Sequence, residues 1–355
     1  MIKGIKMPQR TVGWDIGGAH IKAAVLEMDG TVSNVFQLPC PLWKGIEFLN
    51  QSVRQIVHKI SDKHCLHAVT MTGELADCFK SREQGVEQII AAMQNNLSDQ
   101  DIVIYAGLEG FIRPQDIKTQ HYLSIASANW LASASLAANR IKNGLFIDIG
   151  STTSDILVLA ESQVKAIGLT DYQRLLSDEL VYTGIVRTAV MAVAQTAYFK
   201  GQGMGLMAEY FATMADVYRL TGELNEIHDQ TETADGNGKT IQASALRLSR
   251  MTAYDFCETE MALWQQFARG IKTQQKDKIK EACERQLSRN LISHKDYFIG
   301  AGVGRFLVRE IAAELGFPYM DYSDLFASNL ADIDMDVADC APAVAVAILF
   351  SSQGE

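Results

Sequence analysis

The chain contains two copies of a strand-ending aspartate that is followed at once by a glycine turn. Asp15-Ile-Gly17-Gly18 ends one apolar run, and Asp148-Ile-Gly150-Ser151-Thr152-Thr153 ends another. Glycines let the backbone approach a phosphate without a Cβ in the way, and hydroxyls add hydrogen-bond donors. Carboxylates deep in a cleft are costly unless they are compensated, and a hydrated Mg²⁺ held between Asp15 and Asp148 would offset that cost. The two turns therefore predict a site for a phosphorylated ligand with Mg²⁺.

A third glycine cluster, Gly300-Ala-Gly302-Val-Gly304, ends a later apolar run and precedes a helical pattern at 305–315. A helix N-terminus behind such a turn favours an anion or a nucleotide sugar. One Asp-Ile-Gly turn is weak evidence for a site, because the same triplet occurs in many ordinary turns. The repetition carries the hypothesis, and the alternative is a duplicated hairpin domain that binds no ligand.

Two polar residues lie in or just after the first turn. Lys22 either reaches the bound phosphates or is a solvated strand residue. His20 lies within the turn, where a structural hydrogen bond is favoured over catalysis.

The surrounding pattern predicts the elements that position these turns. Asp148 follows Asp15 by 133 residues (148 − 15), and the flanking apolar runs match at the same offset, which indicates two similar domains. Strands are expected at 11–16, 20–26, 31–38, 66–71, 101–105, 145–150, 155–159 and 297–299. Helices are expected at 45–61, 83–97, 130–142, 183–198, 204–220, 253–289 with a break near Gly270, 305–315 and 342–352, and a polar loop at 229–239.

Composition excludes several classes of function. The net charge is −10, from 32 Lys+Arg against 42 Asp+Glu, which argues against nucleic-acid binding and against anionic membrane surfaces. No apolar run is long enough to span a bilayer. The six cysteines form no Cys-x-x-Cys pair and the first residues carry no apolar leader, so a cytoplasmic protein is expected. No pattern indicates an oligomeric state.

The three glycine elements, in this order, resemble the actin / sugar kinase / Hsp70 superfamily. The resemblance implies an α/β fold of two ribonuclease-H-like (actin-like ATPase) domains that face each other across a cleft, each with a mixed sheet flanked by helices. It implies a first domain at 1–143 and a second at 144–338 with a helical insert. The last segment, 339–355, would be a helix that packs back on the first domain.

Further motifs are similar to the hydantoinase A / oxoprolinase-like branch, in a group of tetrahydromethanopterin-linked one-carbon-transfer proteins. They are Thr72-Gly73-Glu74-Leu75 with Asp77 and Arg82, residues 126–130, 148–155, 179–184 with Arg187-Thr188, 208–216 and 233–236. The group is similar to the methanofuran-biosynthesis enzyme that joins an aminomethylfuran-methyl diphosphate to γ-glutamyltyramine. That reaction makes an aryl furfuryl ether and releases diphosphate, so the implied partners are these two small molecules.

The implied chemistry fits the residue types. A furfuryl carbon can carry positive charge, so Mg²⁺ and backbone amides would stabilise the departing diphosphate, and ATP is not expected to be required. The phenol has an unperturbed pKa of about 10 and is therefore protonated at neutral pH. A carboxylate is expected to take its proton. Glu74, Glu209, Asp216 and Asp235 are candidates, and Glu74 is favoured because it follows a predicted strand end at Met71.

The expected site is therefore a set of named residues. The catalytic residues would be Glu74, Asp15, Asp148, Glu209 and Asp216, with Asp15 and Asp148 as metal ligands; the substrate- and phosphate-binding residues would be Gly17, Gly18, His20, Lys22, Thr72, Gly73, Asn129, Gly150, Ser151, Thr152, Thr153, Arg187, Asp235, Gly300 and Gly302.

Plainer interpretations stay open for several of these residues. Glu209 and Asp216 are seven apart and would share one exposed helix face. Asp235 would belong to a surface turn, and Arg187 would pair either with a substrate anion or with Glu179. Asn129 either presents Trp130 to the substrate or caps a helix.

Two other functions compete with the transferase. One is an ATP-dependent small-molecule kinase or a hydantoinase/oxoprolinase-like amide hydrolase that uses the same cleft. The other is a nucleotide-sensing or scaffold protein without chemistry. The transferase would release diphosphate without ATP, the kinase or hydrolase would form ADP, and the scaffold would show no turnover.

Overall fold

The structure is a computed structural model that describes residues 9–60, 65–98, 100–330 and 335–352. The chain divides into two compact units, one made of 1–144, 159–172 and 320–355 and the other of 145–158 and 173–319. The first residues of the chain, on which the expectation of no leader rests, lie outside the described residues. In the described part of the chain, no helix is long and apolar enough to cross a membrane.

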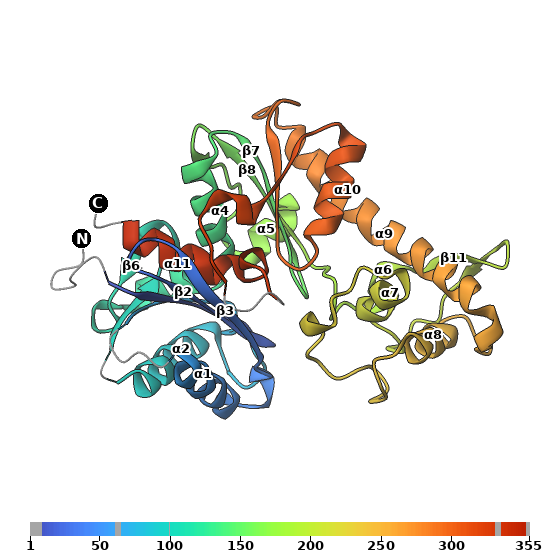
Figure 1. Ribbon diagram of the computed structural model, residues 1–355, viewed down its shortest axis with the longest axis horizontal. Helices are drawn as coiled ribbons and strands as arrows, with labels where there is room; N and C mark the ends of the chain where they lie inside the picture. Colours follow the sequence, from blue (N-terminus) through green and yellow to red (C-terminus); the bar gives the residue numbers. More distant parts are fainter. Residues whose placement is uncertain (1–8, 61–64, 99, 331–334, 353–355) are drawn as a thin grey trace. The chain divides into compact units, whose positions relative to one another are not determined.

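The first unit is built on a six-stranded mixed sheet in the order β3-β2-β1-β4-β5-β6 (Figure 1). Its strands are β1 (Thr11–Ile16), β2 (His20–Leu26), β3 (Val32–Pro39), β4 (Leu66–Met71), β5 (Asp101–Tyr105) and β6 (Phe111–Ile112). The first three strands lie where they were predicted and pair antiparallel, and β4 runs parallel to β1. The turns after β1 and β4 therefore emerge side by side at one edge of the sheet.

Helices cover both faces of this sheet, which explains why β1 is apolar without alternation. The helices of the unit are α1 (Ile46–Ile60), α2 (Arg82–Asn96), α3 (Tyr122–Ile125), α4 (Asn129–Arg140) and α11 (Ala341–Ser351). α1 and α2 lie on one face, and α11 crosses the other face against β1, β2, β4 and α4. The backbones of β1 and α11 approach so closely that a Cβ at Gly13 would lie 1.9 Å from the carbonyl oxygen of Ala343.

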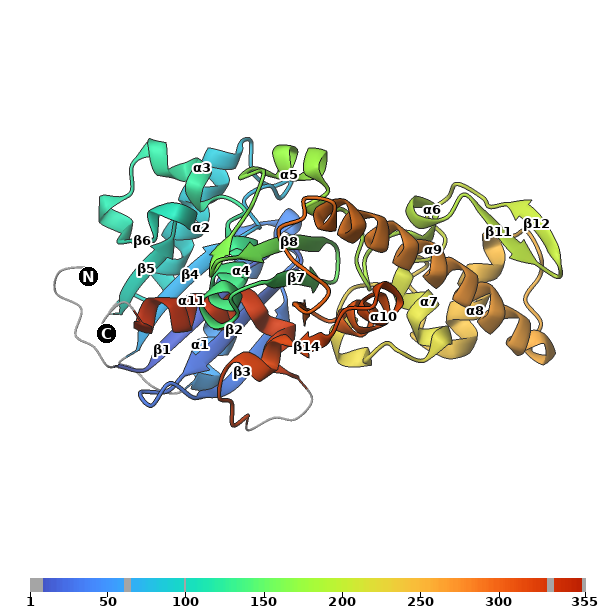
Figure 2. The same cartoon turned by 90° about the horizontal axis from the view of Figure 1, so that it is seen from above.

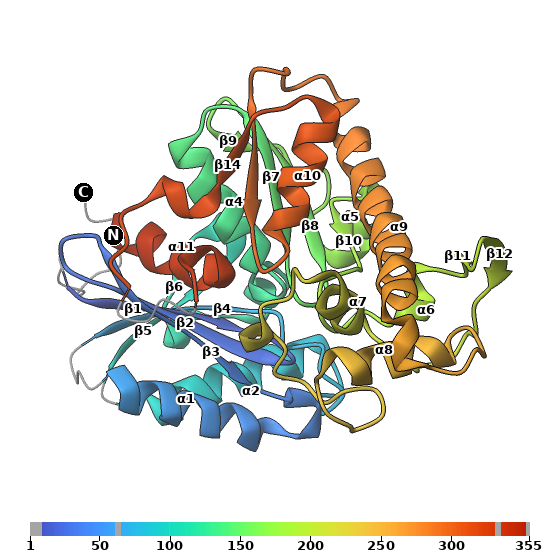
Figure 3. The same cartoon turned by 45° about the vertical axis from the view of Figure 1, so that its right-hand side comes forward.

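The second sheet repeats this strand pattern. Its order is β10-β8-β7-β13-β14, with β9 paired to β8, so β7 lies between β8 and β13 as β1 lies between β2 and β4. The strands are β7 (Gly144–Ile149), β8 (Ser154–Ala160), β9 (Gln163–Val164), β10 (Leu180–Val181), β13 (Tyr297–Ala301) and β14 (Tyr319–Asp321). Figure 3 shows α10 (Arg305–Leu315) and α9 (Met261–Leu287) beside this sheet. The predicted α/β class with two mixed sheets flanked by helices is confirmed.

The helical part of the second unit differs from the sequence-based expectation. Helices predicted at 183–198 and 204–220 are wrong. These spans hold only α6 (Val190–Val193) and α7 (Met214–Thr221), with a hairpin of β11 (Thr196–Phe199) and β12 (Gln202–Gly205) between them. The remaining helices are α5 (Asp171–Ser177) and α8 (Ile241–Arg250). The expected break at Gly270 is also absent, because α9 runs unbroken through it (Figure 2).

The reason lies in distant backbone hydrogen bonds. The amide of Ile185 donates to the carbonyl of Gly150, and the amides of Val186 and Arg187 donate to Ser151. These donors serve the second glycine turn instead of a local helix. A local periodicity does not reveal such partners, which is why the helical prediction failed there.

Candidate active site

The first glycine turn and the segment after β4 form one cluster in the first unit. The amides of Thr72 and Gly73 both donate to the carbonyl oxygen of Ile16, each at 2.9 Å. A Cβ at Gly73 would lie 3.2 Å from the carbonyl carbon of Gly17. A Cβ at Gly18 would meet no atom within 4 Å, so open space borders this turn. The structure thus brings together Gly17, Gly18, Thr72 and Gly73.

Asp15 lies at the end of β1 and is only 7% exposed. The side-chain amide of Asn129 approaches its Oδ1 at 3.5 Å, at the start of α4. The Asn129 Oδ1 also accepts a hydrogen bond from the amide of Trp130, and Trp130 is buried. Asn129 therefore both orders the start of α4 and faces Asp15. The exposure of Trp130 is 3%, so its ring belongs to the core instead of a substrate surface.

Lys22 and His20 lie on β2 beside the turn. The ammonium of Lys22 donates to the carbonyl oxygen of Asp339 at 2.6 Å, so it ties β2 to the segment before α11. His20 is buried, and its carbonyl oxygen accepts the amide of Gly17 at 3.0 Å. Both contacts hold the first turn against neighbouring backbone.

Glu74 is the buried acid next to this cluster. Its side chain has no exposed surface, and its Oε1 accepts a hydrogen bond from the Ser127 hydroxyl at 2.7 Å. In the described part of the chain, the other oxygen, Oε2, has no hydrogen-bond partner. Burial raises the pKa of Glu74 to about 7, although the hydrogen bond from Ser127 and the charge of Arg82 lower it. A carboxyl with a pKa near neutrality is suited to take up or release a proton at physiological pH.

The sequence interpretation assigned no role to the groups around Glu74. Ser127 also lies 3.0 Å from Asp171 Oδ2, and Asp171 pairs with Arg82 at 3.2 Å. Ser127 has a φ of +50°, a left-handed conformation that is unusual for a residue with a side chain. Ser127 and Arg82 stand in motifs that carried the family resemblance, and this was the only sequence signal for them.

The second glycine turn is built in the same manner within the second unit. Ile149, the counterpart of Ile16 at the offset of 133, accepts the amide of Gly304 on its carbonyl oxygen at 2.8 Å. Residues 302–304 of the third glycine cluster therefore follow β13 as Thr72 and Gly73 follow β4, whereas Gly300 lies within β13, where a Cβ would meet the Tyr319 ring. The structure brings together Asp148, Gly150, Ser151, Thr152, Thr153 and Gly302.

Arg187 lies against the second turn. Its guanidinium approaches the Thr152 hydroxyl at 3.4 Å, and its amide donates to Ser151. Glu179 accepts a hydrogen bond from Ser177 and lies 3.7 Å from Arg289. Arg187 therefore lies beside the second turn, and its pairing with a substrate anion or with Glu179 stays a prediction.

The remaining acidic candidates lie in the helical part of the second unit. Glu209 is exposed in a loop, so the expectation that it shares a helix face with Asp216 is wrong. Asp216 is 2% exposed at the third position of α7, where it accepts the amide of Thr213 and so completes a capping box. The spacing Thr213-x-x-Asp216 was a sequence signal for this cap that was overlooked.

Asp216 and Asp235 belong to one buried ion network. Arg247, with no exposed side chain, reaches Asp216 at 2.6 Å and Asp235 at 3.1 Å. Burial alone would raise the pKa of Asp235, but hydrogen bonds from Asn237, Arg250 and Arg247 hold it well below its usual range. Such a carboxylate is a weak base, which argues against Asp235 as the group that takes the phenol proton.

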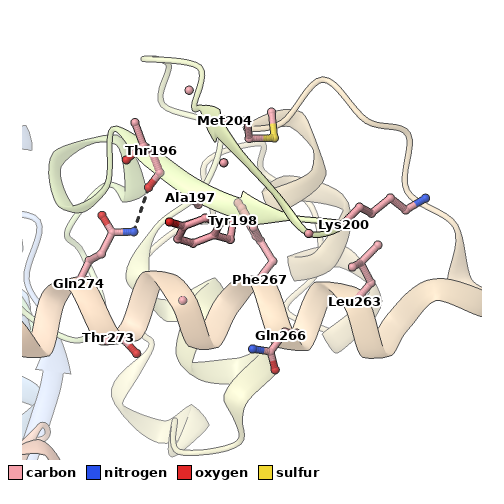
Figure 4. Close-up of a pocket in the computed structure, with 14 residues that line it drawn as sticks. Thr196, Ala197, Tyr198, Lys200, Met204, Leu263, Gln266, Phe267, Thr273 and Gln274 are labelled. Carbon is pink, nitrogen blue, oxygen red and sulfur yellow. Dashed lines mark hydrogen bonds between the residues drawn. The ribbon is translucent and has the colours of Figure 1, made fainter.

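A separate cavity of about 780 Å³ lies between the β11–β12 hairpin and α9. Its lining includes Tyr198, Lys200, Met204 and Phe267, and Figure 4 shows Gln274 donating to the carbonyl of Thr196 at its edge. The lining contains no carboxylate and no imidazole, so it offers no acid–base pair. None of the predicted site residues lines it.

Comparisons with known proteins agree with this architecture. The model of the hydantoinase/oxoprolinase family matches residues 66–342. A protein of Methanocaldococcus jannaschii is 32% identical over 245 residues, which are 69% of this chain and 72% of that protein. It is named as the synthase of a (furan-2-yl)methanamine that carries a phenoxymethyl group with a γ-L-glutamylaminoethyl substituent.

Two further similarities are more distant. A Methanococcus vannielii protein of the same name is 30% identical over 120 residues, which are 34% of this chain and 54% of that protein. A nucleotide-free acetone carboxylase structure superposes with a TM-score of 0.58 at 10% identity, over 95% of this chain and 70% of that chain. At that identity the likeness concerns the fold alone. The extent of the family match and the methanogen relative together show that the chain belongs to the hydantoinase/oxoprolinase family.

Proposed function

We propose that the protein is a transferase that joins an aminomethylfuran-methyl diphosphate to the phenol of γ-glutamyltyramine and releases diphosphate. The observation that carries the proposal is the 32% identity to the methanogen synthase over 72% of that protein. The name of that synthase describes an aryl furfuryl ether, which this reaction would form. The proposed role in this chain is the same bond formation in methanofuran synthesis, which serves tetrahydromethanopterin-linked one-carbon metabolism.

The first unit supports the proposal with a phosphate-sized turn and a neighbouring acid. Gly18 provides backbone that a phosphate can approach, whereas a Cβ at Gly17 would meet the His20 carbonyl oxygen at 2.8 Å, and Glu74 lies one residue beyond Gly73, which packs on that turn. In the proposed reaction, Glu74 takes the proton of the phenol as the phenol oxygen bonds to the furfuryl carbon. Glu74 is fully buried, so binding of the phenol requires the segments that cover it to part.

The second unit supports the proposal with its own phosphate turn. Gly150 and the three hydroxyl residues after it offer amides and hydroxyls to the diphosphate, and Arg187 adds a positive charge. These groups act on negative charge that grows as the C–O bond to diphosphate breaks, so they lower the barrier more than they tighten binding.

Mg²⁺ is part of the proposal. In the described part of the chain, no three His, Cys, Asp or Glu side chains come together as a metal site. Mg²⁺ is typically held by one or two carboxylates together with substrate phosphates and water, which fits a buried Asp15 or a half-buried Asp148 beside a phosphate turn. The ion would neutralise the leaving diphosphate. ATP has no required role in this reaction.

The test is an assay of the purified protein with Mg²⁺ and the two proposed substrates. We expect diphosphate and the aryl ether in equal amounts without ATP. A strict requirement for ATP, with ADP formed in step with product, would instead establish a kinase or an ATP-dependent hydrolase. If the furfuryl diphosphate stabilises the protein against unfolding but is not turned over, with or without ATP, both enzyme functions are rejected in favour of a binding protein.

A further inference from the structure

The Ser127 hydroxyl is shared by two carboxyl groups. Its Oγ lies 2.7 Å from Glu74 Oε1 and 3.0 Å from Asp171 Oδ2. A hydroxyl has one hydrogen to donate, whereas an ionised carboxylate only accepts. If both acids were ionised, one of them would face a lone pair of Ser127 at hydrogen-bond distance. The contacts are all satisfied only if one of the two acids carries a proton.

The surroundings decide which acid holds that proton. Asp171 pairs with Arg82 at 3.2 Å, and its side chain is 23% exposed, so both the ion pair and water favour its charge. Glu74 is fully buried. The charged groups that act on it are Arg82 at the start of α2 and Asp171 at the start of α5, and they act in opposite directions. Removing Glu74 from water therefore favours its neutral form.

We infer that Glu74, Ser127 and Asp171 form a proton relay, in which a protonated Glu74 donates to Ser127 and Ser127 donates to an ionised Asp171. Glu74 Oε2 is the entrance, because in the described residues it has no hydrogen-bond partner. Asp171 is the exit, because it is partly exposed to water. Arg82 keeps the exit charged and ready to accept a proton. The inference rests on the proposed function for the identity of the proton donor.

The relay carries one proton from the phenol to water while the new C–O bond forms. The phenol O–H bond breaks as its proton binds Glu74 Oε2, and the phenol oxygen's electron pair forms the bond to the furfuryl carbon. The bond from that carbon to diphosphate breaks, and its electrons leave with diphosphate. At the same time the proton on Glu74 Oε1 moves to Ser127 Oγ, and the Ser127 hydrogen moves to Asp171 Oδ2. Asp171 then releases its proton to water, and Glu74 is neutral again with the proton that it received.

Ser127 has a backbone conformation that supports a dedicated role. Its φ of +50° is costly for a residue with a Cβ, and glycine would adopt it more easily. The strain persists because the segment between α3 and α4 places the hydroxyl between the two acids. Ser127→Gly therefore removes the hydroxyl while it relaxes the backbone, and this variant separates loss of the relay from loss of folding.

The first experiment needs no substrate. The infrared band of a protonated carboxyl is followed across pH in the whole protein, and the part that Glu74→Gln abolishes is assigned to Glu74. In the unmodified protein this band is expected at pH 6 and is half lost near pH 7. In Asp171→Asn the midpoint moves to lower pH, because the charge that disfavours ionised Glu74 is gone. When Glu74 ionises, Ser127 can turn its hydrogen toward the Glu74 carboxylate; in Ser127→Gly this hydrogen bond is not available, so the midpoint moves to higher pH.

Two matched variants serve as controls. Ser124 donates to Glu109 Oε1 at 2.6 Å at the surface, and Asp178 pairs with Arg285 at 2.5 Å. Ser124→Gly and Asp178→Asn remove the same chemical groups elsewhere and should leave the Glu74 midpoint unchanged. Absence of a Glu74-dependent band at pH 6, or an unchanged midpoint in Asp171→Asn, would overturn the relay.

The second experiment measures turnover. Asp171→Asn and Ser127→Gly should each lower kcat by about a hundredfold or more with little change in KM, because the lost contribution is proton transfer. The alkaline limb of the pH profile of kcat should move with the infrared midpoint in each variant, because the relay requires protonated Glu74. Wild-type kcat in both variants would reject the relay even if the infrared shifts occur. If the unmodified protein shows no diphosphate release, the proposed function fails, and the infrared titration still decides the protonation of Glu74.

Discussion

Gly302 contacts Asp148 so closely that a Cβ on Gly302 would lie 2.2 Å from the Asp148 Oδ1. The two residues are 154 apart in sequence (302 − 148) and meet because β13 lies beside β7 in the second sheet. Gly302 has a φ of +76°, and the following turn returns to the carbonyl of Ile149. The third glycine cluster therefore positions the aspartate of the second turn.

Gly302→Ala should reduce activity by displacing Asp148. Gly316→Ala is the matched control, because Gly316 has a φ of +73° and a Cβ there would meet no atom within 4 Å. Both variants carry the cost of a left-handed alanine, about 1–2 kcal/mol. Only Gly302→Ala adds the clash, so it should have a lower Tm than Gly316→Ala and at least tenfold lower kcat/KM. Equal effects in the two variants would show that Gly302 is needed only for its backbone conformation.

Gly150→Ala tests the approach of phosphate to the second turn. A Cβ at Gly150 would meet only the Thr153 carbonyl, at 3.4 Å, so the protein itself accommodates it. We expect kcat/KM for the diphosphate substrate to fall by orders of magnitude with little change in Tm, because the methyl group occupies the path of the ligand. Gly238→Ala, at another position with open space, should leave both quantities unchanged. Unchanged kcat/KM in Gly150→Ala would remove this turn from the site.

Asp15→Asn and Asp148→Asn test the metal. Each change keeps the shape of the side chain and removes the charge that would hold Mg²⁺. We expect each variant to lose Mg²⁺-dependent diphosphate release by about a hundredfold or more while the fold persists. Activity is measured against Mg²⁺ concentration, with circular dichroism as the check on folding. Full activity in both variants would mean that the two Asp-Ile-Gly turns are purely structural.

Asp216→Ala should destabilise the second unit. It would leave Arg247, which has no exposed side chain, without its 2.6 Å partner. Breaking a buried pair in this manner costs about 3–5 kcal/mol. Urea unfolding measures the loss, and Asp255→Ala, at an exposed position, provides the control. A loss below about 1 kcal/mol, typical of an exposed pair, would contradict the assigned role.

The same network implies a pH dependence of stability. The pKa of Asp235 in the folded protein is below its unfolded value of about 4. The contribution of ionised Asp235 to the free energy of unfolding is therefore complete above the unfolded pKa, and it is lost as the pH falls toward the folded pKa. The stability difference between the unmodified protein and Asp235→Asn, measured by urea unfolding, should therefore shrink in acid.

The sequence by itself determined the repeated strand and turn units. A run of apolar residues that ends in Asp-Ile-Gly specifies a buried strand and a close-approach turn through local chemistry. The offset of 133 that joins Asp15 to Asp148 reappears in the carbonyls of Ile16 and Ile149, which accept equivalent amides. Glu74 was also favoured as the base from its place after a strand; the structure shows that it is buried, and burial raises its pKa, while its catalytic role stays a prediction.

Only the tertiary structure decided which groups surround these turns. The failed helices at 183–198 and 204–220 follow a plausible local pattern, but their backbone donors serve residues far away in sequence. Asp216 is held by Arg247, and Ser127 reaches Glu74 and Asp171, through contacts between segments that no spacing relates. Burial raises the pKa of Glu74, and burial depends on what packs around the side chain. The chemistry of Glu74 therefore follows from the fold and not from the residue type alone.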